Sequence, residues 1–200
     1  PLAQTLKALQ IANAQQYTFT AASTNNRREH VGWGFPSLRN MYDNRARTYI
    51  VPETDVLTQG LGRTHYVTVA AGVPELKACM TFVDPAGNPA SSLARINDLT
   101  LRVVSPAGIV YWGNNGLTAG NYSTPGGAPN TVDTVENVFV QNPAAGVWTV
   151  DVIATLIAQD AHLATTQVDA TYALCVVGGT GTIGGTGSYV LDYMVKTPVK

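Results

Sequence analysis

The stretch NDLTLRVVSPAGIVYWGNN, residues 97–115, decides the expected fold. Within it, Leu99, Leu101 and Val103 alternate with polar residues, and this period of two is typical of a strand with one buried face. A Ser-Pro-Ala-Gly turn then leads into GIVYW, residues 108–112, which has the composition of a short second strand. The stretch therefore predicts an antiparallel hairpin that carries Asn and Asp clusters at both ends.

The same strand signals recur from residue 45 onward. Short runs rich in Val, Tyr and Thr, such as RTHYVTVA, LKACMTFVD and GVWTVDVIAT, are separated by clusters of Gly, Pro and Asn. Many short strands without helical runs between them indicate a two-sheet antiparallel sandwich of jelly-roll or related topology. We expect a mainly β fold with this β-sandwich over residues 45–200. A Gly-rich segment near 178–187 is expected to be a flexible connection into a last strand over 188–195.

Residues 1–44 differ from the rest of the chain. Leu2, Leu6 and Leu9 recur at helical spacing, which predicts a short amphipathic helix. A polar, irregular segment follows, and PSLRNMY indicates a second short helix with Leu38, Met41 and Tyr42 on one face. Because two helices do not make a domain, we expect their apolar faces to rest on the sandwich or on another molecule.

The composition narrows the classes of partner and cofactor. Twelve Lys and Arg residues stand against 13 Asp and Glu, which gives a net charge of −1. A balance of this kind does not predict binding to nucleic acid or to an anionic membrane. No apolar run of about 18 residues and no signal-peptide pattern occurs in the sequence. The run GGTGTIG has dinucleotide-type spacing, but no helix follows it, so a nucleotide cofactor is not expected.

Three histidines and two cysteines are the candidates for nucleophilic chemistry. No Ser or Cys in a nucleophile-elbow context accompanies His30, His65 or His162, so we interpret the histidines as surface or internally satisfied residues. Cys79 and Cys175 lie in strand-like runs far apart in sequence. A disulfide would require those two strands to be neighbours, and buried free thiols are the equal alternative. No catalysis is expected of this chain alone.

Strand parity predicts an acidic rim at one end of the sandwich. If consecutive strands run antiparallel, the end of one and the start of the next lie at the same end. The side chains gathered in this way are Asp84, Asn97, Asp98, Asn114, Asp133 and Glu136. Calcium takes about six to eight oxygen ligands, so calcium is the candidate cofactor of the rim. The alternative is that each Asn or Asp serves only its own turn.

Aromatic residues support a second functional interpretation. Tyr111, Trp112, Tyr122 and Trp148 could stack on sugar rings, although core or rim packing is the commoner role of such residues. The alternative function is therefore an extracellular carbohydrate- or protein-binding module of sandwich type.

Separated segments of the chain resemble subtilisin-like serine proteases. GWGFPSLRNMY, residues 32–42, resembles the Gly-x-Gly segment and short helix that close the catalytic domain. LAQTLKALQIANAQ resembles the helix that comes after the one carrying the catalytic serine. The opening stretch and DTVENVFVQNPAAGVWTVDV resemble the β-sandwich that follows the catalytic domain in some members, and ATYALCVVGG resembles its last strand. Together these segments extend over residues 2–179.

The resemblance implies that residues 1–44 end a catalytic domain and that residues 45–200 are the sandwich after it. The family's nucleophile lies in a Gly-Thr-Ser-Met-Ala context, and neither this nor the family's Asp and His motifs occurs here. The implied function is a noncatalytic region of a secreted serine endopeptidase, which packs on the parent's catalytic domain, stabilises it and assists substrate positioning. Calcium is also implied, but Thr100 stands where the family pattern often has an aspartate.

Overall fold

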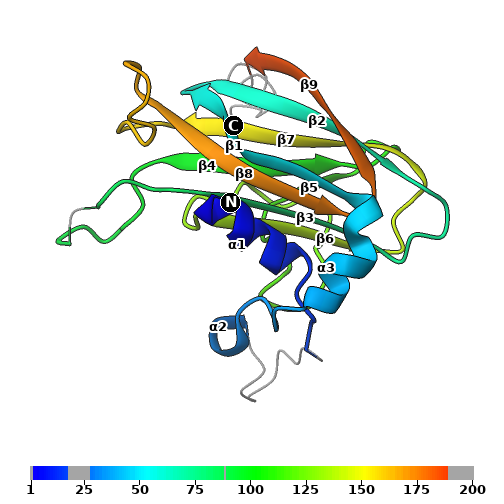
Figure 1. Ribbon diagram of the computed structural model, residues 1–200. Coiled ribbons are helices and arrows are strands. Elements are labelled where there is room, and N and C mark those ends of the chain that lie inside the picture. Colours follow the sequence, from blue (N-terminus) through cyan, green and yellow to red (C-terminus); the bar gives the residue numbers. More distant parts are fainter. Residues whose placement is uncertain (1, 18–27, 88, 189–200) are drawn as a thin grey trace, which may run out of the picture.

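The computed structural model describes residues 2–17, 28–87 and 89–188, which form two stacked antiparallel sheets and a few short helices (Figure 1). The first sheet has the order β1 (Thr48–Thr58), β8 (Asp169–Val177), β3 (Glu75–Phe82) and β6 (Val135–Gln141). The second sheet has the order β5 (Val110–Trp112), β4 (Asp98–Val104), β7 (Gly146–Leu156), β2 (Leu61–Val69) and β9 (Thr180–Ser188). The first eight strands have the order of a jelly roll, and β9 extends the second sheet. The predicted mainly β, jelly-roll-like sandwich is confirmed.

The core lies between the two sheets. Leu99, Leu101 and Val103 of β4 are fully buried, as their alternation predicts. They belong to one apolar cluster with residues of the first sheet, among them Met80 of β3 and Leu174 of β8. Burying side chains of this size contributes about 1.5–3 kcal/mol each to folding, so the core is the main source of stability.

Helix α1 (Ala3–Ala12) packs on the outer face of the first sheet (Figure 1). Ala8 and Ala12 are each 1% exposed and form a second buried cluster with Cys79 of β3 and Cys175 of β8. Small side chains on this helix face let the helix backbone approach the sheet closely. The first helix is thus attached directly to the sandwich.

The buried face of α1 differs from the predicted one. Leu2 and Leu6 are 49% and 42% exposed, and only Leu9 packs against the buried cluster. The orientation of the helix is fixed at its first turn, where the Glu53 carboxylate accepts hydrogen bonds from Thr5 N (3.0 Å) and Thr5 Oγ1 (3.1 Å). Because the first amides of a helix have no partner within the helix, Glu53 acts as a cap supplied by β1.

Two further helices and one 3₁₀ turn complete the N-terminal segment, namely α2 (Arg28–Val31), α3 (Leu38–Asn44) and η1 (Arg45–Arg47). The predicted Gly-Trp-Gly segment joins α2 to α3. Gly34 has a φ of +105°, and a Cβ on it would collide with the carbonyl of Gln15. This close approach lets Gln15 and Phe35 exchange backbone hydrogen bonds of 2.8 and 3.0 Å. No helix in the described part of the chain is long and apolar enough to cross a membrane.

The Gly-rich segment departs from the prediction of a flexible connection. Residues 180–188 form strand β9, which pairs with β2. Glycine is required here because a Cβ on Gly181 would collide with the Tyr49 ring, and one on Gly179 would lie 2.5 Å from Val67 Cγ1. The last strand predicted over 188–195 lies, from residue 189 on, outside the described residues.

Candidate functional site

Glu136, like Asn97, is one of the most deeply buried members of the acidic rim. It lies opposite Met80 on the inner face of the first sheet and is fully buried. Its Oε2 accepts a hydrogen bond from the backbone N of Leu101 in β4 at 2.8 Å, so the carboxylate links the two sheets. Gly113 makes this link possible, because a Cβ at that position would overlap the carboxylate.

Electrostatics in this part of the rim are unfavourable for negative charge. Burial raises the pKa of Glu136 well above its ordinary value, and the nearby Asp98 and Asp133 raise it further, while Arg95 lowers it. Burial also raises the pKa of Asp98, whose Oδ1 lies 3.7 Å from Arg95 Nη1. Within the described residues, Glu136 Oε1 and Asp98 Oδ1 are buried without a hydrogen-bond partner. A cation would relieve both the repulsion and the missing contacts.

Asp84 and Asn97 organise loops at the same end of the sandwich. Asp84 Oδ1 and Oδ2 accept hydrogen bonds from the backbone N atoms of Asn97 (2.7 Å) and Ile96 (2.8 Å). Asn97 Oδ1 in turn accepts from the backbone N atoms of Ala158 and Gln159, at 2.9 and 3.0 Å. The side-chain oxygens of both residues are therefore already used by backbone donors.

Asn114 and Asp133 meet beside the start of β6. Asn114, with a φ of +62°, donates through Nδ2 to Asp133 Oδ2 (3.1 Å) and to the carbonyl of Val135 (2.8 Å). Its Oδ1 accepts from the backbone N of Asn137 at 2.8 Å. Asp133 Oδ2 also accepts from Asn130 Nδ2 at 2.7 Å. The hairpin thus returns Asn114 to β6, where the sequence places it.

The acidic rim consequently divides into two groups. In one group, Asp84, Asn97 and Asn114 have side-chain oxygens that accept hydrogen bonds from backbone N–H groups. In the other, the charges of Asp98 and Asp133 act on Glu136, which accepts one backbone hydrogen bond at Oε2. Among the residues that the structure describes, no group of three or more His, Cys, Asp and Glu side chains could hold a metal ion as it stands. The orphaned oxygens of Asp98 and Glu136 suit a hard cation. Thr100 does not substitute for a carboxylate, because its hydroxyl pairs with that of Thr155 at 2.9 Å.

A second polar cluster, which sequence reasoning does not assemble, is buried at the other side of the core. It consists of Tyr49, Asp55, Arg63, His65 and Tyr172. Arg63 forms a bidentate pair with the Asp55 carboxylate, with both distances 2.7 Å. Tyr172 donates its hydroxyl proton to Asp55 Oδ2 at 2.6 Å. The cluster joins β1 and β8 of the first sheet to β2 of the second.

The hydrogen bonds of this cluster fix the state of His65. Because Tyr172 gives its only proton to Asp55, its oxygen accepts from His65 Nε2 at 2.8 Å. The other ring nitrogen, Nδ1, then accepts from the Tyr49 hydroxyl at 3.0 Å. Burial lowers the pKa of His65 to about 4, which agrees with a neutral ring. This is the internally satisfied histidine that we expected, and it lies on the same buried face of β2 as Val67.

The aromatic residues proposed for sugar stacking do not form one exposed platform. Tyr111 and Trp148 are buried in the core, with ring centroids 6.1 Å apart. Tyr122 is half-buried and donates its hydroxyl to Glu75 Oε1 at 2.7 Å, and the pKa of Tyr122 is raised to about 12 by burial and by this carboxylate. Trp112 is also half-buried. Core and rim packing account for these four side chains.

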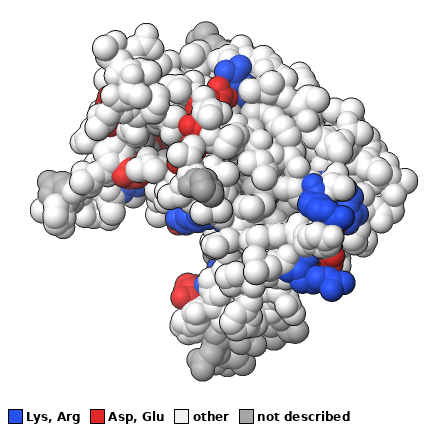
Figure 2. All heavy atoms as spheres, viewed as in Figure 1, with Lys and Arg blue, Asp and Glu red and all other residues white. Residues whose placement is uncertain are grey.

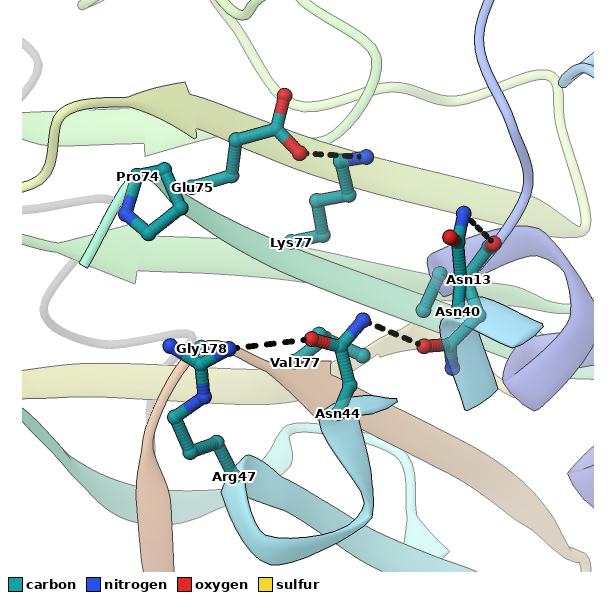
Figure 3. A pocket seen from close by; sticks show the side chains of 10 residues that line it. Asn13, Asn40, Asn44, Arg47, Pro74, Glu75, Lys77, Val177 and Gly178 are labelled. Atoms are coloured by element: carbon teal, nitrogen blue, oxygen red, sulfur yellow. Dashed lines mark hydrogen bonds and ion pairs between the residues drawn. The ribbon is translucent and has the colours of Figure 1, made fainter. Parts of the chain in front are cut away.

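A polar cavity of about 150 Å³ lies at the end of α1, between α3 and the first sheet (Figure 3). Asn13 is bonded to both flanking asparagines of α3, accepting from Asn44 Nδ2 at its Oδ1 and from Asn40 Nδ2 at its carbonyl, both at 3.0 Å. Lys77 and Glu75 form an ion pair of 2.8 Å on the wall. The asparagine bonds join the end of α1 to α3, and the ion pair lies within β3, so the polar groups of the wall already bind one another.

A wider cavity of about 340 Å³ lies between α2 and the start of β6. Its wall includes Trp33, Leu117 and two rim residues, Asn114 and Asp133. The Arg28 guanidinium lies 4.7 Å from the Trp33 ring centroid and donates through Nε to the carbonyl of Leu117 at 3.1 Å. On the face shown in Figure 2, charged side chains lie in small separate groups among uncharged residues. Residues of the N-terminal segment and residues of the acidic rim therefore line the same cavity.

No protein-family model matches the chain, and no curated protein matches it. Among solved structures, the chain is similar to a lipase of Bacillus licheniformis, BlEst2, in its propeptide form, with 16% sequence identity and a TM-score of 0.35. The match extends over 66% of this chain but only 22% of the lipase chain.

Proposed function

We propose that this chain is the noncatalytic C-terminal region of a secreted subtilisin-like serine endopeptidase, and that it stabilises the catalytic domain by packing against it. The sequence segments that resemble this family support the proposal, as does the absence of the family's triad motifs from the sequence. In this role the sandwich supplies no catalytic residue. Positioning of large substrates would follow from its place beside the catalytic domain.

The structural observation that carries the proposal is a set of exposed apolar side chains on the N-terminal segment. Because α1 turns its alanines to the sheet, Leu2 and Leu6 stay largely exposed. Leu38 and Tyr42, one turn apart on α3, are 82% and 63% exposed, and Phe35 is exposed as well. Five large apolar side chains within the segment that resembles the end of a catalytic domain suit contact with the rest of such a domain.

Binding in trans tests this proposal. The coding sequence upstream of Pro1 should contain a Gly-Thr-Ser nucleophile context, and the catalytic domain that it encodes is titrated with this chain by calorimetry. We expect binding that weakens at least tenfold in a Leu38→Ser/Tyr42→Ser variant. The matched control is Leu163→Ser/Val168→Ser, which removes equally exposed side chains from a distant loop. Absence of binding, or the same loss in both variants, would overturn the proposal.

The chain alone should be inactive on peptide bonds. A general protease substrate should stay intact with the purified chain, whereas hydrolysis that is blocked by a serine reagent would contradict the noncatalytic role. This measurement is independent of the binding test, because it needs no second protein.

We also propose that calcium binds at Asp98, Asp133 and Glu136. The two orphaned oxygens and the repulsion of the Glu136 carboxylate by Asp98 and Asp133 support this assignment. A ligand at a hundred times its dissociation constant adds about 2.7 kcal/mol, so the melting temperature should be higher in calcium than in chelator. Asp133→Asn should abolish that difference, whereas Asp84→Asn, which alters a loop carboxylate outside the set, should preserve it. Identical melting temperatures of the wild type in calcium and chelator would rule calcium out.

A further inference from the structure

Cys79 and Cys175 are brought together by the register of two neighbouring strands. The register of β3 and β8 places the two residues directly opposite each other. On β3, the even-numbered Phe82 donates its backbone N–H to the carbonyl of Thr134, away from β8. At the end of β8, the even-numbered Gly178 donates its backbone N–H to the carbonyl of Arg47, away from β3. The odd-numbered residues of both strands, among them the two cysteines, have the opposite orientation. The backbone groups of the two cysteines therefore face each other.

Such a hydrogen-bonded pair has the spacing of a disulfide. Its Cα atoms lie about 5.5 Å apart, which is within the commonest Cα separation of disulfide-bonded cysteines, about 5.5–6 Å. Both side chains point to the outer face of the sheet, where they belong to one buried cluster with the small side chains of Ala8 and Ala12. In a hydrogen-bonded pair the Cβ atoms lie about 5.5 Å apart, so they need to approach by at least about 1 Å for the bond to close. The small side chains of Ala8 and Ala12 border the space in which this movement takes place.

We propose that Cys79 and Cys175 are an oxidation site, at which a disulfide joins β3 to β8 when the chain meets a disulfide oxidant such as oxidised glutathione. One cysteine thiolate attacks the glutathione disulfide and releases one reduced glutathione. The second cysteine thiolate then attacks the mixed disulfide and releases the other. The two protein thiols lose two protons and two electrons in total, and these appear on the two glutathione thiols.

Helix α1 controls access to the site. Both thiols are fully buried, and burial raises the pKa of each above its ordinary value. Reaction with a dissolved oxidant therefore proceeds through local opening of α1 from the sheet. The Glu53 carboxylate, which holds Thr5 at the first turn of the helix, sets how often this opening occurs.

The test counts thiols in the folded, full-length chain. The reduced protein is incubated with oxidised glutathione, quenched with acid, unfolded, alkylated and weighed by intact mass spectrometry. We expect both thiols to disappear together, without a retained glutathione, and both to return with dithiothreitol. Cys79→Ser and Cys175→Ser should give no internal disulfide. Persistence of two alkylatable thiols, two glutathione adducts, or chains linked to each other would overturn the proposal, provided that the urea-unfolded chain oxidises in the same time.

A second measurement tests access through α1. Glu53→Ala removes a cap whose contribution of about 1 kcal/mol corresponds to about fivefold more frequent opening, so oxidation should be about fivefold faster. Glu29→Ala, which removes an exposed carboxylate of α2, is the matched control and should leave the rate unchanged. Equal rates in the wild type and the Glu53 variant would show that α1 does not control access.

Discussion

His65 should make the protein less stable as the pH falls below about 6.5. The pKa of His65 is lowered from 6.5 to about 4 by burial, so the unfolded chain binds a proton more readily than the folded one between these values. Protonation of Nδ1 also removes the acceptor of the Tyr49 hydroxyl. The contribution of His65 to stability is thus complete above the ordinary pKa and is lost as the pH falls towards about 4.

The size of this effect follows from the two pKa values. The full difference corresponds to about 3 kcal/mol, at about 1.4 kcal/mol per pKa unit. At about pH 5, where the folded protein is still mostly neutral at His65, linkage gives a loss of about 2 kcal/mol relative to about pH 7.5. Burial acts to raise the pKa of Asp55, but its hydrogen bonds to Arg63 and Tyr172 lower that pKa overall. Asp55 therefore causes a further loss of stability only at still lower pH.

Glu136 acts in the opposite direction, so a variant is needed to isolate His65. The raised pKa of Glu136 means that its contribution is present at low pH and is lost as the pH rises through the folded value. We therefore compare wild type with His65→Gln by urea unfolding, followed by tryptophan fluorescence, at about pH 7.5 and about pH 5. The free energy of unfolding of the wild type should fall by about 2 kcal/mol more than that of the variant. Equal pH dependence in the two proteins would refute the reasoning.

The remaining predictions concern the inter-sheet link and the helix cap. In chelator, Glu136→Gln should be more stable than wild type at about pH 8 and similar to it at about pH 4.5, because the amide carries no charge to bury; greater stability of the wild type at the higher pH would contradict this. Gly113→Ala should cost about 1–3 kcal/mol in urea unfolding through overlap with Glu136, whereas Gly120→Ala, where a Cβ meets open space, should cost about 0.5 kcal/mol or less; equal costs would argue against the link. Glu53→Ala should lose about 0.5–2 kcal/mol of unfolding free energy, and an unchanged value would show that the cap does not hold α1.

The fold is predictable from local patterns because burial on one face of a strand imposes a period of two. Leu99 and Leu101 show that period and are fully buried, and the turn residues between strands mark the ends of the hairpins. The glycine segment could not be interpreted in the same way. Glycines such as Gly181 are there because another element, the Tyr49 ring, lies against the backbone, and this contact has no local signature.

The candidate site is only partly predictable for a similar reason. Parity correctly indicates that the hairpin returns Asn114 to the start of β6, but it does not reveal that the Asp84 oxygens bind backbone amides. The buried polar cluster depends on Tyr172 reaching Asp55 across 117 positions of sequence. The only indication of this cluster in the sequence is that His65 lies two residues from Val67, on the same buried face of β2.

The N-terminal helix shows how tertiary contacts override an amphipathic pattern. The leucines of α1 predict its apolar face, yet Ala8 and Ala12 are the residues buried on the sheet. Close approach of the helix to β3 and β8, together with the Glu53 cap, outweighs the burial of Leu2 and Leu6. The leucines left at the surface are the basis of the proposed contact with a catalytic domain.

The most direct test of the central claim is the rate at which the catalytic domain encoded upstream of this chain loses activity on heating. The domain is incubated alone, with the wild-type chain, and with the Leu38→Ser/Tyr42→Ser variant, and residual protease activity is followed over time. We predict that the wild-type chain slows the inactivation and that the variant does so much less. The same inactivation rate with and without the wild-type chain would contradict the stabilising role proposed for this protein.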